Sequence, residues 1–264
     1  MSRTRAARST RLRAPVLAAV LCTAGAASAA PDDVVARPLV LPRFGVEAAA
    51  VLELDVSRRL GEPASLAPDV WFGATDDLTV GVVHSARALS IVDAGLGVCF
   101  RGEEHGCPRA YDNVGVEARW SLARGALAAA ARGRFVVRTF DAWKPRFGAG
   151  ALVRWSRGRL GITGDPALSV GLANRDEGNR AQLDVPLWLA VQPTCRWALH
   201  VRTGVHGSLA TFGDTFEVPI GLGVTAAAHR RVDIAVEAAF RRLLGPLNDY
   251  KNRMAWVALT VRWP

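Results

Sequence analysis

The sequence predicts an all-β fold, a single closed antiparallel β-barrel that spans a membrane. Three observations support this prediction: apolar and polar residues alternate after residue 43, short turns and long loops alternate between the proposed strands, and the N-terminus has the features of an export signal. Half of the 264 residues are hydrophobic, which excludes a disordered chain. No uncharged apolar stretch reaches the roughly 18–20 residues that a membrane helix requires.

Residues 1–29 are expected to be a cleaved secretory signal peptide. Five arginines and no acid precede the uncharged run Pro15–Ala24, and Ala27-Ser28-Ala29 has the small residues of a cleavage site. The chain has 33 basic and 24 acidic residues, a net charge of +9; without those five arginines the balance is 28 against 24, or +4. The basic excess is therefore mainly a targeting feature and does not indicate nucleic-acid binding. We expect residues 30–43 to be a short periplasmic lead and residues 44–264 to be the barrel.

Alternation defines the expected strands. From Leu183 to Val191 every second residue is apolar, whereas Asp184 and Gln192 have the opposite parity. The same pattern recurs along the chain. Twelve strands fit it best, while ten or fourteen remain compatible because Ala88–Phe100 could add a hairpin. The expected strands cover residues 44–58, 66–75, 77–86, 113–123, 125–138, 146–157, 159–171, 181–192, 196–208, 215–227, 231–243 and 254–263.

The connections between these strands alternate in length. Turns such as Arg157-Gly158 are tight, and Ala86–Asn113 is by far the longest connection. The other long, polar connections are Arg58–Ser65, Phe140–Pro145, Asn174–Arg180, Leu209–Asp214 and Leu244–Arg253. Short turns at one end and long loops at the other are typical of an outer-membrane barrel. Because lipid offers no hydrogen bonds, strands cross a bilayer only where the sheet closes and every backbone group is paired.

The last expected strand resembles the C-terminal signal of Gram-negative outer-membrane β-barrels. Apolar residues alternate into the C-terminus at Val257, Leu259, Val261 and Trp263. The aromatic residue is penultimate, because Pro264 is last. The resemblance is porin-like, with no specific subfamily. It implies an outer-membrane location, contact with the lipid bilayer and lipopolysaccharide, and assembly by the machinery that recognises such a strand. It implies no active-site residues.

Charged residues of inward parity would line the interior of this barrel, and two interpretations follow. In the first, the barrel is a narrow pore for small solutes, and the ladder of Arg132, Arg134 and Arg138 draws anions. In the second, ion pairs fill the lumen, and the barrel is structural or binds a ligand or partner. The inward candidates are Glu47, Glu53, Asp55, Glu117, Asp184, Glu217, Asp233 and Glu237 against Arg119, Arg132, Arg134, Arg138, Arg154, Arg202, Arg241 and Arg262.

A lipid hydrolase is the third interpretation. His206 and Ser208 share one strand face, as a base and a nucleophile would, and Glu217 on the next strand could orient the imidazole. Outer-membrane lipid hydrolases resemble this His-x-Ser arrangement, but their pair faces lipid, whereas parity places this pair inside. We therefore predict no catalytic residues. No motif for a cofactor, a metal or nucleic acid rises above chance, and the sequence does not define an oligomeric state.

The longest connection holds two cysteines. Cys99 and Cys107 are expected to form a local disulfide, because an exported protein matures in an oxidising compartment. Free thiols and a metal site are the alternatives, although one cysteine pair with His105 falls short of a zinc pattern.

Tryptophan parity separates two groups. Trp120, Trp155, Trp197 and Trp263 have outward parity and could form aromatic girdles at the membrane interfaces. Trp71, Trp188 and Trp256 have inward parity, so we expect them to pack inside the lumen or to narrow it.

Overall fold

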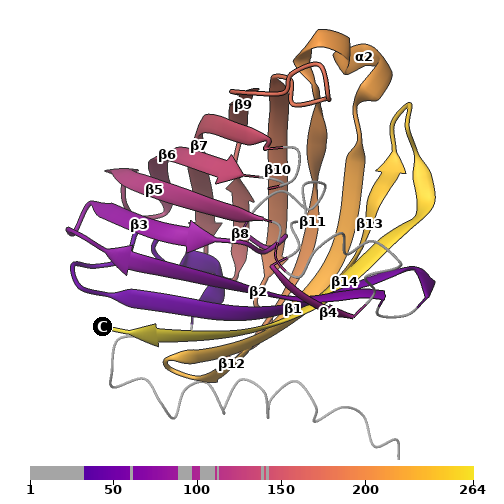
Figure 1. Ribbon diagram of the computed structural model, residues 1–264. Coiled ribbons are helices and arrows are strands. Elements are labelled where there is room, and N and C mark those ends of the chain that lie inside the picture. Colours follow the sequence, from indigo (N-terminus) through magenta and orange to yellow (C-terminus); the bar gives the residue numbers. More distant parts are fainter. Residues whose placement is uncertain are drawn as a thin grey trace, which may run out of the picture.

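The chain forms a ring of antiparallel strands (Figure 1). The structure is a computed structural model and describes residues 33–59, 62–88, 97–101, 111, 113–137, 140 and 143–264. The expected signal peptide lies outside these residues, so its cleavage stays a prediction. The strands are β1 (Val46–Arg59), β2 (Glu62–Gly73), β3 (Leu78–Val83), β4 (Val98–Arg101), β5 (Val114–Ala123), β6 (Leu127–Val137), β7 (Pro145–Arg157), β8 (Leu160–Gly164), β9 (Ala167–Gly171), β10 (Gln182–Val191), β11 (Trp197–Ser208), β12 (Val218–His229), β13 (Val232–Leu244) and β14 (Asp249–Trp263).

The ring is closed. β1 pairs with β2 on one side and with the last strand, β14, on the other, from Val46↔Trp263 to Asp55↔Met254. β8 and β9 occupy one position in the wall, because both pair with β7 and β10 and only Asp165-Pro166 separates them. β4 is an extra strand beside β2. Without β4, and with β8 and β9 counted as one position, the wall has twelve strand positions. This confirms the predicted closed twelve-strand barrel.

The connections fall into two sets, one at each end of the barrel. We call the end with connections 74–77, 124–126, 158–159, 192–196 and 230–231 the turn end, and the opposite end the loop end. At the loop end, the short helices η3 (Leu209–Thr211) and α2 (Phe212–Thr215) join β11 to β12 (Figure 1). Another short helix, η1 (Val34–Ala36), precedes β1. Within the described ranges, no helix is long and apolar enough to cross a bilayer.

Two loops predicted to be long are shorter in the structure. The connection predicted at Arg58–Ser65 is reduced because β1 and β2 stay paired as far as Arg59↔Glu62. The connection predicted at Leu244–Arg253 is reduced because β14 already begins at Asp249. In both hairpins, continued pairing satisfies backbone groups that a loop would leave to water.

One strand is shorter than predicted. Alternation predicts a strand at residues 77–86, but β3 ends at Val83 because the chain then turns into the barrel. The inward carboxylate of Asp69 on β2 accepts hydrogen bonds from the backbone N–H groups of His84 (2.7 Å) and Ser85 (3.0 Å). β4 pairs with β2 toward the loop end, where β3 no longer accompanies it. Of the extra hairpin considered at Ala88–Phe100, residues 89–96 lie outside the described residues.

The outer face of the wall is apolar. Large hydrophobic side chains on alternate positions are exposed along the strands, such as Leu222 on β12 and Ile234 on β13. The four tryptophans of outward parity are between 40% and 52% exposed and lie close to the turn end: Trp120, Trp155, Trp197 and Trp263. An apolar band with an aromatic edge is the surface that a barrel presents to lipid and its headgroups.

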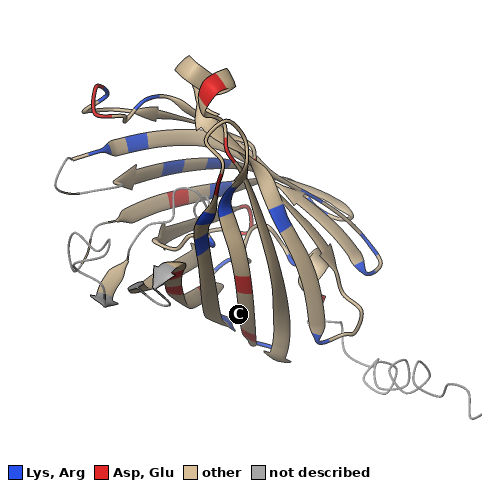
Figure 2. Cartoon of the chain, turned by 90° about the vertical axis from the view of Figure 1, so that its right-hand side faces the viewer, with Lys and Arg blue, Asp and Glu red and all other residues tan. Residues whose placement is uncertain are grey.

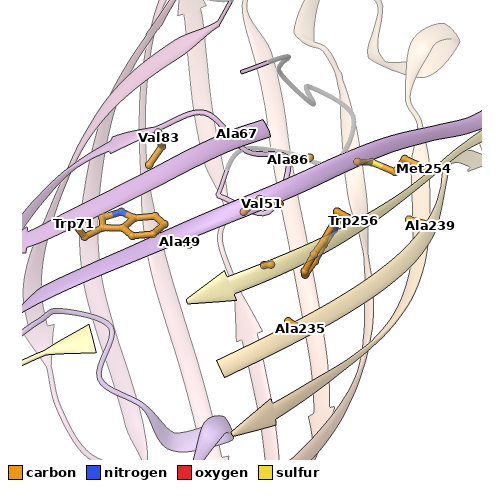
Figure 3. Packing of buried hydrophobic residues seen from close by; sticks show 11 residues of the cluster. Ala49, Val51, Ala67, Trp71, Val83, Ala86, Ala235, Ala239, Met254 and Trp256 are labelled. Atoms are coloured by element: carbon orange, nitrogen blue, oxygen red, sulfur yellow. The ribbon is translucent and has the colours of Figure 1, made fainter. Parts of the chain in front are cut away.

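The inner face carries an apolar cluster on one side of the ring (Figure 3). Trp71 of β2 and Trp256 of β14 are its largest members, and Ala86 joins it from the segment that follows β3. The cluster therefore fills part of the lumen with packed side chains. Its members are Ala49, Val51, Ala67, Trp71, Val83, Ala86, Ala235, Ala239, Met254, Trp256 and Ala258.

The face assignment predicts unequal costs for the same substitution. Leu222 is 64% exposed on the outer face of β12, so Leu222→Arg should lower the free energy of unfolding by about 2–4 kcal/mol near the membrane midplane. Thr225→Arg on the inner face of the same strand is the matched control and should cost less, because the lumen hydrates the guanidinium. Urea unfolding from lipid vesicles, followed by tryptophan fluorescence, measures both variants. Equal losses would contradict the assignment.

Candidate functional site

The basic side chains of the lumen gather on β5, β6 and β7. Arg119 and Arg132 lie directly opposite each other across the β5–β6 pair, and Arg134 lies opposite Glu117. Arg154 continues this basic face on β7 and is buried. Figure 2 shows that basic and acidic positions occur within the strands as well as at the loops. The inner wall on these three strands therefore carries more positive than negative charge.

The acidic side chains gather across the ring. Glu53 on β1, Asp69 on β2, and Asp233 and Glu237 on β13 are all buried on the inner wall. β13, β14, β1 and β2 are consecutive neighbours in the ring, whereas β5–β7 lie beyond β3. The lumen thus has a basic side and an acidic side.

Ion pairs hold the basic side in place. Glu117 lies between two arginines: Arg119 Nε donates to Oε1 at 2.5 Å, and Arg134 Nε donates to Oε2 at 2.7 Å. Arg132 pairs with Asp165, the residue between β8 and β9. Three guanidiniums share two carboxylates in this group, so it keeps a net positive charge.

The acidic side is paired as well. Arg262 Nε binds Glu47 at 2.7 Å, and another nitrogen of the same guanidinium binds Asp233. Glu237 accepts a hydrogen bond from His200 Nε2 at 2.9 Å. The imidazole reaches that carboxylate across Gly223, where a Cβ would lie only 2.3 Å from Nε2, so this position requires glycine.

Residues 84–88, which we call the constricting segment, fold into the lumen after β3. Asp69 accepts hydrogen bonds from the Ser85 backbone N–H and from its hydroxyl group. The backbone N–H of Ala86 donates to Glu53 Oε1 at 2.5 Å. The acidic side of the lumen thus binds the N–H groups of this segment.

Two arginines, Arg134 of the basic side and Arg202 on β11, bind the carbonyl groups of the same segment. Arg202 Nη2 donates to the Ala86 carbonyl oxygen at 2.8 Å, and Arg134 Nη2 donates to the Ala88 carbonyl oxygen at 2.7 Å. Hydrogen bonds with one charged partner are stronger than neutral ones. Carboxylates of β1 and β2 and guanidiniums of β6 and β11 therefore fix a peptide segment between them, and that segment narrows the lumen.

Removal of Asp69 should release the constricting segment. Asp69→Ala leaves the backbone N–H groups of His84 and Ser85 without their acceptor. A buried unpaired donor costs about 1–3 kcal/mol, so amide hydrogen exchange at residues 84–88 should accelerate by about tenfold or more. Mass spectrometry of the deuterated protein measures this exchange rate. Asp77→Ala, which removes an exposed carboxylate bound by Arg124 at the turn end, is the control and should leave this exchange unchanged. Unchanged exchange in both variants would contradict the anchoring role.

Residues 33–43, which we call the floor segment, cross the turn end of the barrel. The Val35 N–H donates to Gln192 Oε1 at 3.3 Å, beyond β10, and the Leu41 N–H donates to Thr79 Oγ1 at 2.7 Å on β3. Arg37 binds Asp233 on β13 with two nitrogens. β3, β10 and β13 are well separated around the ring. The described part of the expected periplasmic lead therefore lies inside the mouth of the barrel.

A cavity of about 330 Å³ lies between the floor segment and the constricting segment. Three tryptophans of inward parity contribute to its wall, and the guanidinium of Arg119 lies 5.1 Å from the ring centre of one of them, Trp71. The charged residues of its lining are five arginines, Arg87, Arg119, Arg132, Arg134 and Arg154, and three acids, Glu47, Asp165 and Glu237, together with His200. This chamber has polar and aromatic surfaces and an excess of positive charge.

The structure places the predicted charge candidates as follows. Glu53, Glu117, Glu217, Asp233, Glu237, Arg132, Arg154 and Arg202 are buried on the inner wall, and Glu47, Asp55, Asp184, Arg119, Arg134, Arg241 and Arg262 are half-buried there. Arg138 lies outside the described residues, so the ladder is described only at Arg132 and Arg134. Cys99 is buried on β4, whereas Cys107 also lies outside the described residues, so their disulfide stays a prediction.

The proposed hydrolase residues are close together but are not arranged as a catalytic triad. His206 Nδ1 lies 3.6 Å from the Asp184 carboxylate, whereas the Glu217 carboxylate binds Arg242 Nε at 2.9 Å. Glu217 meets His206 through backbone hydrogen bonds. The buried hydroxyl of Ser208 makes no hydrogen bond within the described part of the chain, whereas an activated nucleophile is hydrogen-bonded to its base. Among the described residues, no group of three or more metal-ligating side chains occurs either.

Several residues of the site were not predicted from the sequence. Asp69 is the single acid of inward parity in the apolar strand β2, a signal that could have marked it. Asp165 follows the end of β8, and its pairing with Arg132 depends on a register that alternation does not fix. The inward course of the constricting and floor segments has no periodic signal, because neither segment is a strand.

Comparisons with known proteins agree with this geometry. No protein-family model matches the chain, and no curated protein matches it significantly. Among solved structures, the NanC porin superposes with a TM-score of 0.58 at 6% identity, over 82% of this chain and 99% of that one. The KdgM porin gives 0.54 at 6% identity, over 83% and 99% of the two chains. The COG4313 outer-membrane channel from Pseudomonas putida F1 gives 0.51 at 10% identity, over 85% and 97%.

These identities are too low to indicate more than a shared architecture. The fold is that of outer-membrane porins and channels, and it confirms the barrel class predicted from alternation and from the last strand.

Proposed function

We propose that the protein is a narrow outer-membrane channel for small solutes and that its lumen prefers anions. The observation that carries the proposal is the chamber of about 330 Å³ inside the closed wall, lined by five arginines and three acids. Fixed charges in a narrow lumen raise the local concentration of counter-ions and select among solutes. An excess of guanidiniums therefore favours anions.

The ion pairs are compatible with a channel as well as with a filled barrel. Glu117 and Asp165 hold Arg119, Arg132 and Arg134 against the wall and leave the chamber beside them open. The ion pairs therefore position the positive charges on the wall and do not fill the chamber. One similar structure is the KdgM porin in complex with disordered oligogalacturonate, with a TM-score of 0.54 at 5% identity. Galacturonate carries a carboxylate, so this likeness is consistent with anions as the preferred solutes.

The architecture also supports a location and an orientation in the membrane. The apolar outer face and its tryptophans support a position in the lipid bilayer of the outer membrane, with the loop end toward lipopolysaccharide and the turn end toward the periplasm. β14 closes the ring and ends at Trp263, which supports recognition by the barrel-assembly machinery. We propose no catalytic role.

Electrical recording tests the proposal. Purified protein in a planar bilayer should give discrete ohmic current steps. In a KCl gradient the reversal potential should show chloride to be more permeant than potassium, because the chamber has more guanidiniums than carboxylates. The protein inserted is first checked for folding by its mobility on an unheated gel. A correctly folded barrel that carries no current would contradict the channel and favour the filled barrel.

A further inference from the structure

A second cavity lies at the turn end, between the floor segment and the inner wall. Its volume is about 380 Å³. One wall is formed by the floor segment, and the other by β5, β6, β7 and the turn that joins β5 to β6. Its lining includes Leu39, Ser121, Arg124, Ala128, Arg154 and Ser156. The cavity thus extends from the interior to a turn at the rim.

Two residues line both this cavity and the central chamber, Leu39 of the floor segment and Arg154 of β7. The two cavities are therefore adjacent, and these side chains form the partition between them. On either side of Leu39 the floor segment is fixed to the wall, because Arg37 binds Asp233 and Val40 packs on Ala130 and Leu152. The partition is consequently the place where the chamber borders the second cavity.

Arg154 differs from the other basic residues of the chamber. Arg119, Arg132 and Arg134 each bind a carboxylate. Arg154 is only 7% exposed, yet its Nε has no hydrogen-bond partner, and no ion pair joins it to another side chain within the described ranges. Asp33 of the floor segment acts on it electrostatically but makes no hydrogen bond with it there. Burial of a guanidinium without a hydrogen-bonded partner is costly, and an anion would offset that cost.

We infer that the second cavity is the turn-end exit of the channel and that Arg154 is an anion-binding residue at its threshold. The inference rests on the proposed function. An anion leaving the chamber exchanges its place near Arg132 for a contact with Arg154, and the hydroxyl groups of Ser121 and Ser156 line the space beyond. At the rim, the guanidinium of Arg124 lies 3.3 Å from the Ser121 hydroxyl. Small anions would pass off the barrel axis, beside the floor segment rather than through it.

Two sets of variants test the exit in planar bilayers. Arg154→Gln should lower the chloride-over-potassium permeability ratio by about twofold or more, whereas Arg154→Lys should keep it, because the positive charge is retained. The matched control is Arg146→Gln, on the inner face of the same strand but outside both cavities, where Asn179 Oδ1 binds the guanidinium at 3.3 Å and 3.4 Å. Its permeability ratio should change less.

The second set, of two variants, tests the route itself. Ala128→Trp places an indole in the second cavity and should reduce the single-channel conductance by about half or more. Ala131→Trp, on the opposite face of β6, is the control and should conduct like the parent protein. The exit would be overturned if the chloride-over-potassium permeability ratio of Arg154→Gln equalled that of Arg146→Gln. It would also be overturned if Ala128→Trp conducted like the parent protein. Either result would leave the proposed channel intact. A parent protein that carries no current would overturn the channel itself, and the exit with it.

Discussion

The structure depends on one constraint: lipid offers no partner for a backbone N–H or C=O group. A sheet that crosses a bilayer must therefore have no edge, and the pairing of β1 with β14 removes the last one. Once the ring is closed, each strand has one face toward lipid and one toward the lumen. The period-two alternation of the sequence, the apolar belt and the interior charges are all consequences of that closure.

The same requirement governs the segments inside the barrel. A peptide that enters the lumen also needs partners, and the constricting segment obtains them from charged walls of opposite sign. Its N–H groups face Glu53 and Asp69, while its carbonyl groups face Arg134 and Arg202. Arg134 both lines the chamber and binds this segment, so one of the charges proposed to favour anions also shapes the lumen. A lumen lined by neutral side chains could not hold this segment so specifically.

The sequence predicts the wall far better than its contents. Alternation fixes the parity of residues such as Arg132 and Trp71, because one period applies along every strand and closure leaves a single consistent choice of faces. It does not fix where a strand stops. β3 ends at Val83 because Asp69, on another strand, captures the next two N–H groups, and no local pattern reports such a contact. The floor segment was not predicted for the same reason: Arg37 finds Asp233 only after the chain has closed on itself. The proposed route past Arg154 depends on the position of that segment, so the sequence could not predict it either.

The central claim is that the lumen is an open path with a preference for negative charge. The most direct measurement is the permeation of two solutes of similar size into liposomes that contain the purified protein, neutral galactose and anionic galacturonate. Our account predicts that both enter faster than into protein-free liposomes and that galacturonate enters faster than galactose, since the chamber has more guanidiniums than carboxylates. Entry of neither solute through a correctly folded barrel would contradict the open path, and faster entry of galactose would contradict the charge preference.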